Sequence, residues 1–125
     1  MRSKKMNIGL AICVLLAKSN STLTTVQISK QLDISVSYCE QVISSLNNSG
    51  LIKSRRGAKG GYQASINLMD TSIKLVMELF DPISNASETA FNFIAAVNNM
   101  ENHIYINMKI RDLVKEYDAL NKEVV

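Results

Sequence analysis

The stretch that decides the fold is SVSYCEQVISSLNNSGLIKSRRGAKGGY, residues 35–62. Its apolar residues recur at the spacing i, i+3, i+4, i+7, which places them on one face of a helix. They are Cys39, Val42, Ile43 and Leu46. The opposite face carries short polar side chains, a type that can hydrogen-bond to base edges in a DNA major groove. They are Ser37, Glu40, Gln41, Ser44 and Ser45.

A helix terminator and a basic hairpin follow in the same stretch. Gly50 can take the left-handed conformation that ends many helices. Two short strands are expected at residues 51–55 and 61–65, joined by a glycine-rich turn. The turn and its flanks carry the cations Arg55, Arg56 and Lys59. A helix followed by a basic hairpin predicts a winged helix.

Outside this stretch, apolar periodicity predicts four further helices and a short last one. They are expected at residues 3–18, 25–32, 71–80 and 87–106, then after Asn107 with fraying from about Asn121. The first of them has almost no polar face, so it must be covered on more than one side. We therefore expect a mainly α fold with a small β-hairpin wing and a long C-terminal helix, a candidate for dimerisation. The expected division is a winged helix-turn-helix domain at 1–81 and a linker with dimerisation helix at 82–125.

Two helix starts carry capping signals. Thr24 and Gln27 have the spacing of a capping box. For the helix that opens the deciding stretch, Ser35 is the expected N-cap, with Ser37 and Glu40 as an alternative pair. In that alternative, Glu40 would be occupied by the cap and could not contact a base.

Charge is unevenly divided along the 125 residues, although the net charge is only +3. Residues 1–66 carry nine Lys and Arg against two Asp and Glu, a net +7. Residues 67–125 carry five against nine, a net −4. A basic front half and an acidic back half are typical of a nucleic-acid face joined to a protein-contact half.

The two cysteines, Cys13 and Cys39, lie inside apolar periodic segments and not in a paired spacing. This placement favours reduced, buried thiols and a cytoplasmic protein without a structural disulfide. The apolar run at residues 8–17 is too short to cross a bilayer, so no membrane partner is expected. The same run behind a basic N-terminus imitates a signal peptide, but no cleavage site follows it.

No enzyme, metal or cofactor signal stands out. His103 is the single histidine and has no cysteine near it in sequence. The two cysteines are too far apart for a zinc knuckle, and the glycine-rich turn lacks the residue order of a phosphate-binding P-loop. We therefore expect a binding protein that is not an enzyme.

Three segments of the deciding stretch resemble a known family. They are Ser-Val-Ser-Tyr-x-Glu-Gln at 35–41, Gly-Leu-Ile-Lys-Ser at 50–54, and Arg-Gly-x-x-Gly-Gly-Tyr at 56–62. Together they resemble the bacterial winged-helix regulators of the Rrf-two family, typified by IscR, NsrR and CymR. The resemblance is strong over residues 1–80 and loose beyond.

The resemblance implies positions for DNA contact. Its base-reading positions fall on Ser37, Tyr38, Glu40, Gln41 and, at the wing tip, Arg56. Glu suits cytosine N4, Gln suits adenine, and Arg suits a narrow minor groove. Phosphate contacts are expected from a second set, which positions the protein without specifying sequence. That set is Arg2, Lys4, Lys5, Lys53, Arg55 and Lys59. The alternative for both sets is a solvated helix face and loop.

One departure from the family concerns iron. Many members hold an iron–sulfur cluster through three cysteines just before the long helix, whereas residues 81–91 here contain none. The chain therefore resembles the cluster-free members, and no cofactor is expected. Cys39, at a position where the family usually has leucine, is a candidate redox-sensitive residue, and Cys13 a weaker one.

The expected partners are a second copy of the chain and a palindromic operator in double-stranded DNA. The residues expected at the dimer interface form a narrow seam, although such a stripe also fits ordinary core. They are Phe93, Val97, Met100 and Ile104. The predicted function is that of a homodimeric repressor, with an effector or partner enzyme left open. Alternatives are a winged-helix protein-interaction module and an RNA binder, since residues 57–60 fit a GXXG loop.

Overall fold

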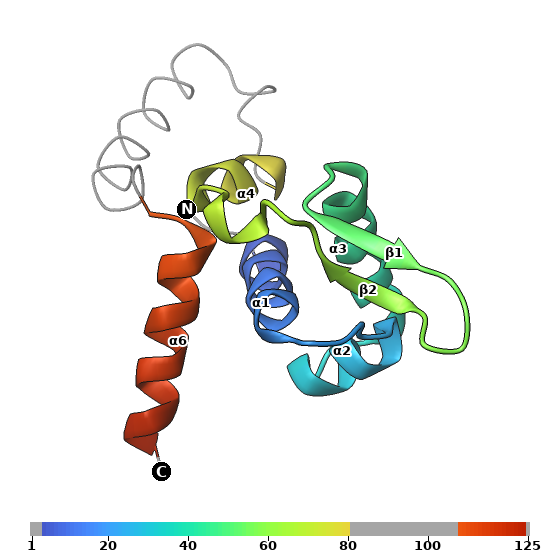
Figure 1. Ribbon diagram of the computed structural model, residues 1–125, viewed down its shortest axis with the longest axis horizontal. Helices are drawn as coiled ribbons and strands as arrows, with labels where there is room; N and C mark the ends of the chain where they lie inside the picture. Colours follow the sequence, from blue (N-terminus) through green and yellow to red (C-terminus); the bar gives the residue numbers. More distant parts are fainter. Residues whose placement is uncertain (1–3, 81–107, 125) are drawn as a thin grey trace.

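The computed structural model describes residues 4–80 and 108–124. Figure 1 shows a mainly helical molecule with one antiparallel hairpin, as the sequence predicts. Its elements are α1 (Lys4–Lys18), α2 (Thr25–Leu32), α3 (Val36–Asn48), β1 (Ile52–Arg55), β2 (Gly61–Ala64), the 3-10 helix η1 (Leu68–Asp70), α4 (Ile73–Phe80) and α6 (Ile110–Val124). The helix predicted at 87–106, its seam and the boundary between residues 81 and 82 lie outside the described residues.

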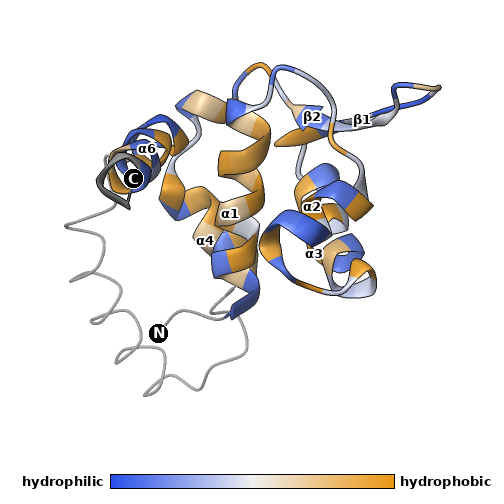
Figure 2. Ribbon diagram, turned by 90° about the horizontal axis from the view of Figure 1, so that it is seen from below, coloured by the Kyte–Doolittle hydropathy of each residue, from blue (hydrophilic) through white to orange (hydrophobic). Residues whose placement is uncertain are grey.

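Helix α1 lies at the centre of the fold, as its lack of a polar face requires. It contacts α2, α3, α4, α6, β2 and η1. Figure 2 shows its largely apolar ribbon with α6 on one side and the α2 and α3 pair on the other. Ile12 and Cys13 are fully buried in one continuous core with residues from every neighbouring helix. None of the described helices is long and apolar enough to span a bilayer.

The helix caps form as predicted and fix the turn between α2 and α3. Thr24 and Gln27 make both hydrogen bonds of a capping box, with N–H to side-chain oxygen distances of 3.1 and 2.8 Å. Ser35 caps α3, since its Oγ accepts from the N–H of Tyr38 at 3.1 Å. Between the two helices, Asp33 ends α2 in the left-handed conformation, with φ of 53°. Because Ser35 is the cap, the alternative with Ser37 is wrong and Glu40 is not used there.

The wing is a two-stranded sheet, in which Ile52 pairs with Ala64 and Arg55 with Gly61. Each strand is one residue shorter than predicted. The loop before α2 adds a single bridge to β2, in which Leu23 and Tyr62 exchange backbone hydrogen bonds of 2.9 and 2.7 Å. Gly61 makes this approach possible, because its φ is +140° and a Cβ there would lie 2.6 Å from the oxygen of Leu23.

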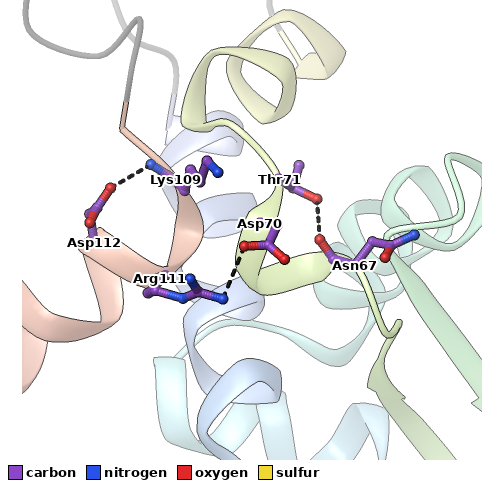
Figure 3. Close-up of polar contacts among 6 residues, drawn as sticks. All are labelled: Asn67, Asp70, Thr71, Lys109, Arg111 and Asp112. Carbon is purple, nitrogen blue, oxygen red and sulfur yellow. Dashed lines mark hydrogen bonds and ion pairs between the residues drawn. The ribbon is translucent and has the colours of Figure 1, made fainter.

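Helix α6 is attached to the segment between η1 and α4. The chain before α6 bridges the chain before α4, where the N–H groups of Ile73 and Ile110 donate to the oxygens of Met108 and Thr71 at 3.0 and 2.9 Å. Figure 3 shows the ion pair between Arg111 and Asp70, at 3.0 Å, that reinforces this bridge. It also shows Thr71 Oγ1 donating to the oxygen of Asn67 and the N–H of Lys109 donating to Asp112.

The end of the chain differs from the sequence prediction. A short last helix fraying from about Asn121 was expected, whereas α6 runs from Ile110 to Val124. Ile110 and Val114 are buried in the core, which anchors the first turns of the helix, and the good helix formers that follow continue it to Val124. Lys18 of α1 adds an ion pair with Asp118.

Gly9 sets how closely α1 and α4 approach. It is buried in α1, and a Cβ atom there would lie 2.8 Å from Cζ of the Phe80 ring. The ring therefore occupies the space that any larger residue at position 9 would need.

Replacing Gly61 with alanine should lower the free energy of unfolding by about 2 kcal/mol or more, because backbone strain and a clash with backbone atoms combine. The matched control is Gly57→Ala. Gly57 also has a positive φ, +107°, but a Cβ there would meet nothing within 4 Å. This control should cost only about 1 kcal/mol. Urea denaturation of both variants measures the difference, and equal losses would show that the contact with Leu23 does not matter.

Candidate nucleic-acid interface

Helix α3 has the two faces that the sequence predicts. Cys39, Val42, Ile43 and Leu46 are all buried in the core. Ser37, Glu40, Gln41 and Ser44 are exposed. Because α1, α2 and β1 pack against α3 from the core side, the polar face is held outward in one orientation. That face can exchange hydrogen bonds with a partner without moving the helix.

The wing lies on the same side of the molecule as α3. Both views place α3 and the hairpin on the side away from α6, and the hairpin tip extends beyond the body (Figures 1 and 2). Four wing cations are exposed. They are Lys53, Arg55, Arg56 and Lys59. Within residues 4–80 and 108–124, no ion pair involves any of them.

The turn end of the wing is anchored by Thr22, a residue that the sequence patterns do not single out. Thr22 Oγ1 lies 2.6 Å from the backbone oxygen of Lys59, to which it donates, and 3.3 Å from that of Gly60. Together with the bridge between Leu23 and Tyr62, this bond fixes the hairpin to the loop before α2. The polar turn preceding a capping box gives no local sign of such a contact, because the partners are 37 residues apart.

The N-terminus of α1 approaches α3. Lys4 Nζ lies 5.7 Å from the centroid of the half-buried Tyr38 ring, within the range of a cation–π contact. Lys4 is exposed and Lys5 is half-buried. Arg2, expected to bind phosphate, lies outside the described residues. The structure thus brings one predicted phosphate-binding side chain beside one predicted base-reading side chain.

The electrostatics of this side favour a polyanion. Of the described residues up to 66, eight are Lys or Arg and only Asp33 and Glu40 are acidic. Lys18 among the eight is paired with Asp118. The unpaired cations of the wing and of the start of α1 could neutralise phosphates and release counterions.

Both thiols are buried and protonated. Burial raises the pKa of Cys13 to about 12. Burial, and to a smaller extent the negative charge of Glu40, also raises the pKa of Cys39. Cys39 Sγ lies 3.8 Å from the backbone oxygen of Thr25, a weak contact across the two helices. Neither thiol has the low pKa and exposure of a reactive cysteine in this conformation.

Comparison with known proteins matches this architecture. A profile of the Rrf2 family, described as an iron-dependent transcriptional regulator, matches residues 2–120. The regulator CymR of Bacillus subtilis is 44% identical over 62 residues, 48% of this chain and 45% of CymR. IscR of Cereibacter sphaeroides is 31% identical over 70 residues, 56% of this chain and 45% of IscR. The chain thus spans about half the length of the curated relatives it matches.

A solved structure extends the likeness over nearly the whole chain. The crystal structure of Staphylococcus aureus CymR superposes with a TM-score of 0.72 at 26% identity. The match covers 90% of this chain and 96% of that one.

The description of the family mentions iron, whereas the cysteines of this chain are few and buried. Iron–sulfur clusters are held mainly by several thiolates, whereas this chain has only two cysteines, both buried with raised pKa values. In the part of the chain that the structure describes, no group of three or more His, Cys, Asp or Glu could hold a metal ion.

The winged-helix architecture, the two-faced α3 and the profile match over residues 2–120 agree. The chain belongs to the Rrf2 family, a family of helix-turn-helix transcriptional regulators and not of enzymes.

Proposed function

We propose that this chain is a sequence-specific DNA-binding regulator, a homodimeric repressor that places α3 in the major groove and the wing in the minor groove. The observation that carries the proposal is the polar face of α3, which is exposed although the helix is immobilised by its buried face. A rigid helix with free hydrogen-bonding side chains fits a major groove, which presents a distinct pattern for each base pair.

Base readout is assigned to Ser37, Tyr38, Glu40 and Gln41 on α3 and to Arg56 at the wing. Ser35 supplies the cap, so the Glu40 carboxylate is available to accept from cytosine N4. Lys53, Arg55 and Lys59, with Arg2, Lys4 and Lys5 at the N-terminus, hold phosphates. The contact between Lys4 and Tyr38 supports this grouping, because it joins a phosphate contact to the reading helix.

Dimerisation is proposed through Phe93, Val97, Met100 and Ile104. A two-fold dimer would present one α3 to each half-site of a palindromic operator, about one helical turn of DNA apart. Residues 1–81 would then form the DNA-binding unit and residues 82–125 the linker and dimerisation region. Repression follows if the operator overlaps a promoter.

We also propose that the regulator works without an iron–sulfur cluster, since its two buried cysteines cannot supply the ligand set. A redox response through Cys39 or Cys13 would require the core to open first, because neither thiol is accessible and both pKa values are raised.

Changing Arg56 to alanine should weaken operator binding about tenfold and leave the melting temperature unchanged, because the side chain is exposed and makes no described ion pair. Lys115→Ala, which removes one exposed cation from α6, is the control and should change the dissociation constant less than twofold. Fluorescence anisotropy with the selected operator measures both. Equal binding by the two variants would remove the wing from the mechanism.

Changing Glu40 to glutamine should shift the preferred base from cytosine toward adenine by about tenfold, because the amide can pair with adenine N6 and N7. The control is Ser35→Ala, which should lower stability by about 1 kcal/mol through loss of the cap and keep the base preference. Selection from a randomised half-site reads both outcomes. An unaltered preference in the Glu40 variant would exclude this residue from base readout.

Salt dependence separates DNA binding from a winged-helix module that binds another protein. If six cations per protomer neutralise phosphates, the logarithm of the association constant should fall against the logarithm of salt concentration with a slope of about −5 or steeper. Lys53→Ala should flatten the slope by about one per protomer. A nearly flat line for the unaltered chain would favour the protein-interaction alternative.

A further inference from the structure

Val36, the first residue of α3, leaves an apolar side chain exposed at the proposed reading surface. It follows the Ser35 cap directly, and 39% of its surface is exposed. Valine is only a modest helix former, and the exposed part of its side chain gains nothing from burial. Single exposed apolar residues are common on protein surfaces. What distinguishes Val36 from the more exposed Val26 is its place on the helix assigned to DNA.

The hydrophobic staple at this helix start does not involve Val36. At a helix start, the residue before the cap often packs against the fourth helical residue as a hydrophobic staple. Here these positions are Ile34 and Cys39, of which Ile34 packs against the core and Cys39 is fully buried. Val36 lies between them in sequence and outside the staple.

Val36 lies next to the polar face of α3. Residues four apart are neighbours on a helix surface, so Val36 lies one turn before Glu40. The distance along the axis is about 6 Å, roughly one or two base-pair steps. Both side chains are exposed, and they border the same outward face as Ser37 and Ser44.

The chemistry of the major groove offers a single apolar group, the 5-methyl of thymine. We infer that Val36 reads a thymine through that methyl, within one or two base pairs of the base that Glu40 contacts. The inference rests on the proposed function and adds one specified base to the half-site. Val36 makes van der Waals contact where its polar neighbours make hydrogen bonds.

The test is a scan of the selected operator in which each thymine of both half-sites is replaced in turn by deoxyuridine. This replacement removes only the methyl group and keeps the base pair. We expect one symmetric position at which it weakens binding of the unaltered chain about three- to fivefold per half-site, as expected for one buried methyl. Because this arm uses the unaltered protein, it does not depend on the folding of any variant.

Two variants assign the effect to a side chain. Val36→Ala should bind the thymine operator more weakly and lose the discrimination against deoxyuridine at that position. Val26→Ala is the matched control, since Val26 of α2 is 47% exposed and loses the same atoms. It should keep the full discrimination.

Three outcomes decide the question. Loss of discrimination in Val36→Ala alone supports the contact. The inferred thymine contact is overturned if Val36→Ala and the unaltered chain discriminate equally, or if no thymine is sensitive to the replacement. In either case, specific and salt-dependent binding would leave the proposed function standing. Failure to select any operator, with a shallow salt slope, overturns both.

Discussion

The fold depends on enclosing α1, a helix with almost no polar face. Such a helix is stable in water only when other elements cover it on several sides. The chain meets this requirement by packing α2, α3, α4 and α6 against it, with β2 and η1 also in contact. The reading helix therefore shares its core with the centre of the molecule and is not a separate appendage.

The same burial explains how α3 can be held rigidly while its polar face remains exposed for binding. Four of its side chains lie in the core, and the cap at Ser35 defines where the helix begins. Pre-organisation of this kind reduces the entropy lost on binding, because the polar side chains already lie on a rigid element. Besides burial of Ile52 in the core, the wing is held by hydrogen bonds through Thr22, Leu23 and Tyr62. These bonds attach the hairpin to the loop that leads into α2. The hairpin and the helix-turn-helix are therefore connected through the same loop.

Sequence patterns predicted those parts of the structure that depend on near neighbours. The periodicity of α3, the caps at Thr24 and Ser35, and the left-handed Gly50 are local, and each formed as expected. Contacts between distant residues left no local signal. The bridge of Leu23 to Tyr62 and the approach of Lys4 to Tyr38 were therefore missed. The helix η1 is local, but its three residues are too few to give a periodic signal. Helix α6 is longer than predicted because burial of Ile110 and Val114 in the core fixes its first turns, and good helix formers such as Lys115, Glu116 and Ala119 continue it. The assignment of individual base-reading residues depends on the family resemblance, since exposure alone cannot distinguish a reading face from a solvated one.

The close approach of Gly9 to Phe80 has an evolutionary consequence. The two positions share one volume across the contact between α1 and α4, so their sizes are inversely linked. A lineage that acquires a side chain at position 9 must shrink the ring at position 80 or separate the two helices. Homologues that keep this helix spacing should therefore vary at the two positions as a compensating pair, and that covariation would record the packing of a helix pair within the central core.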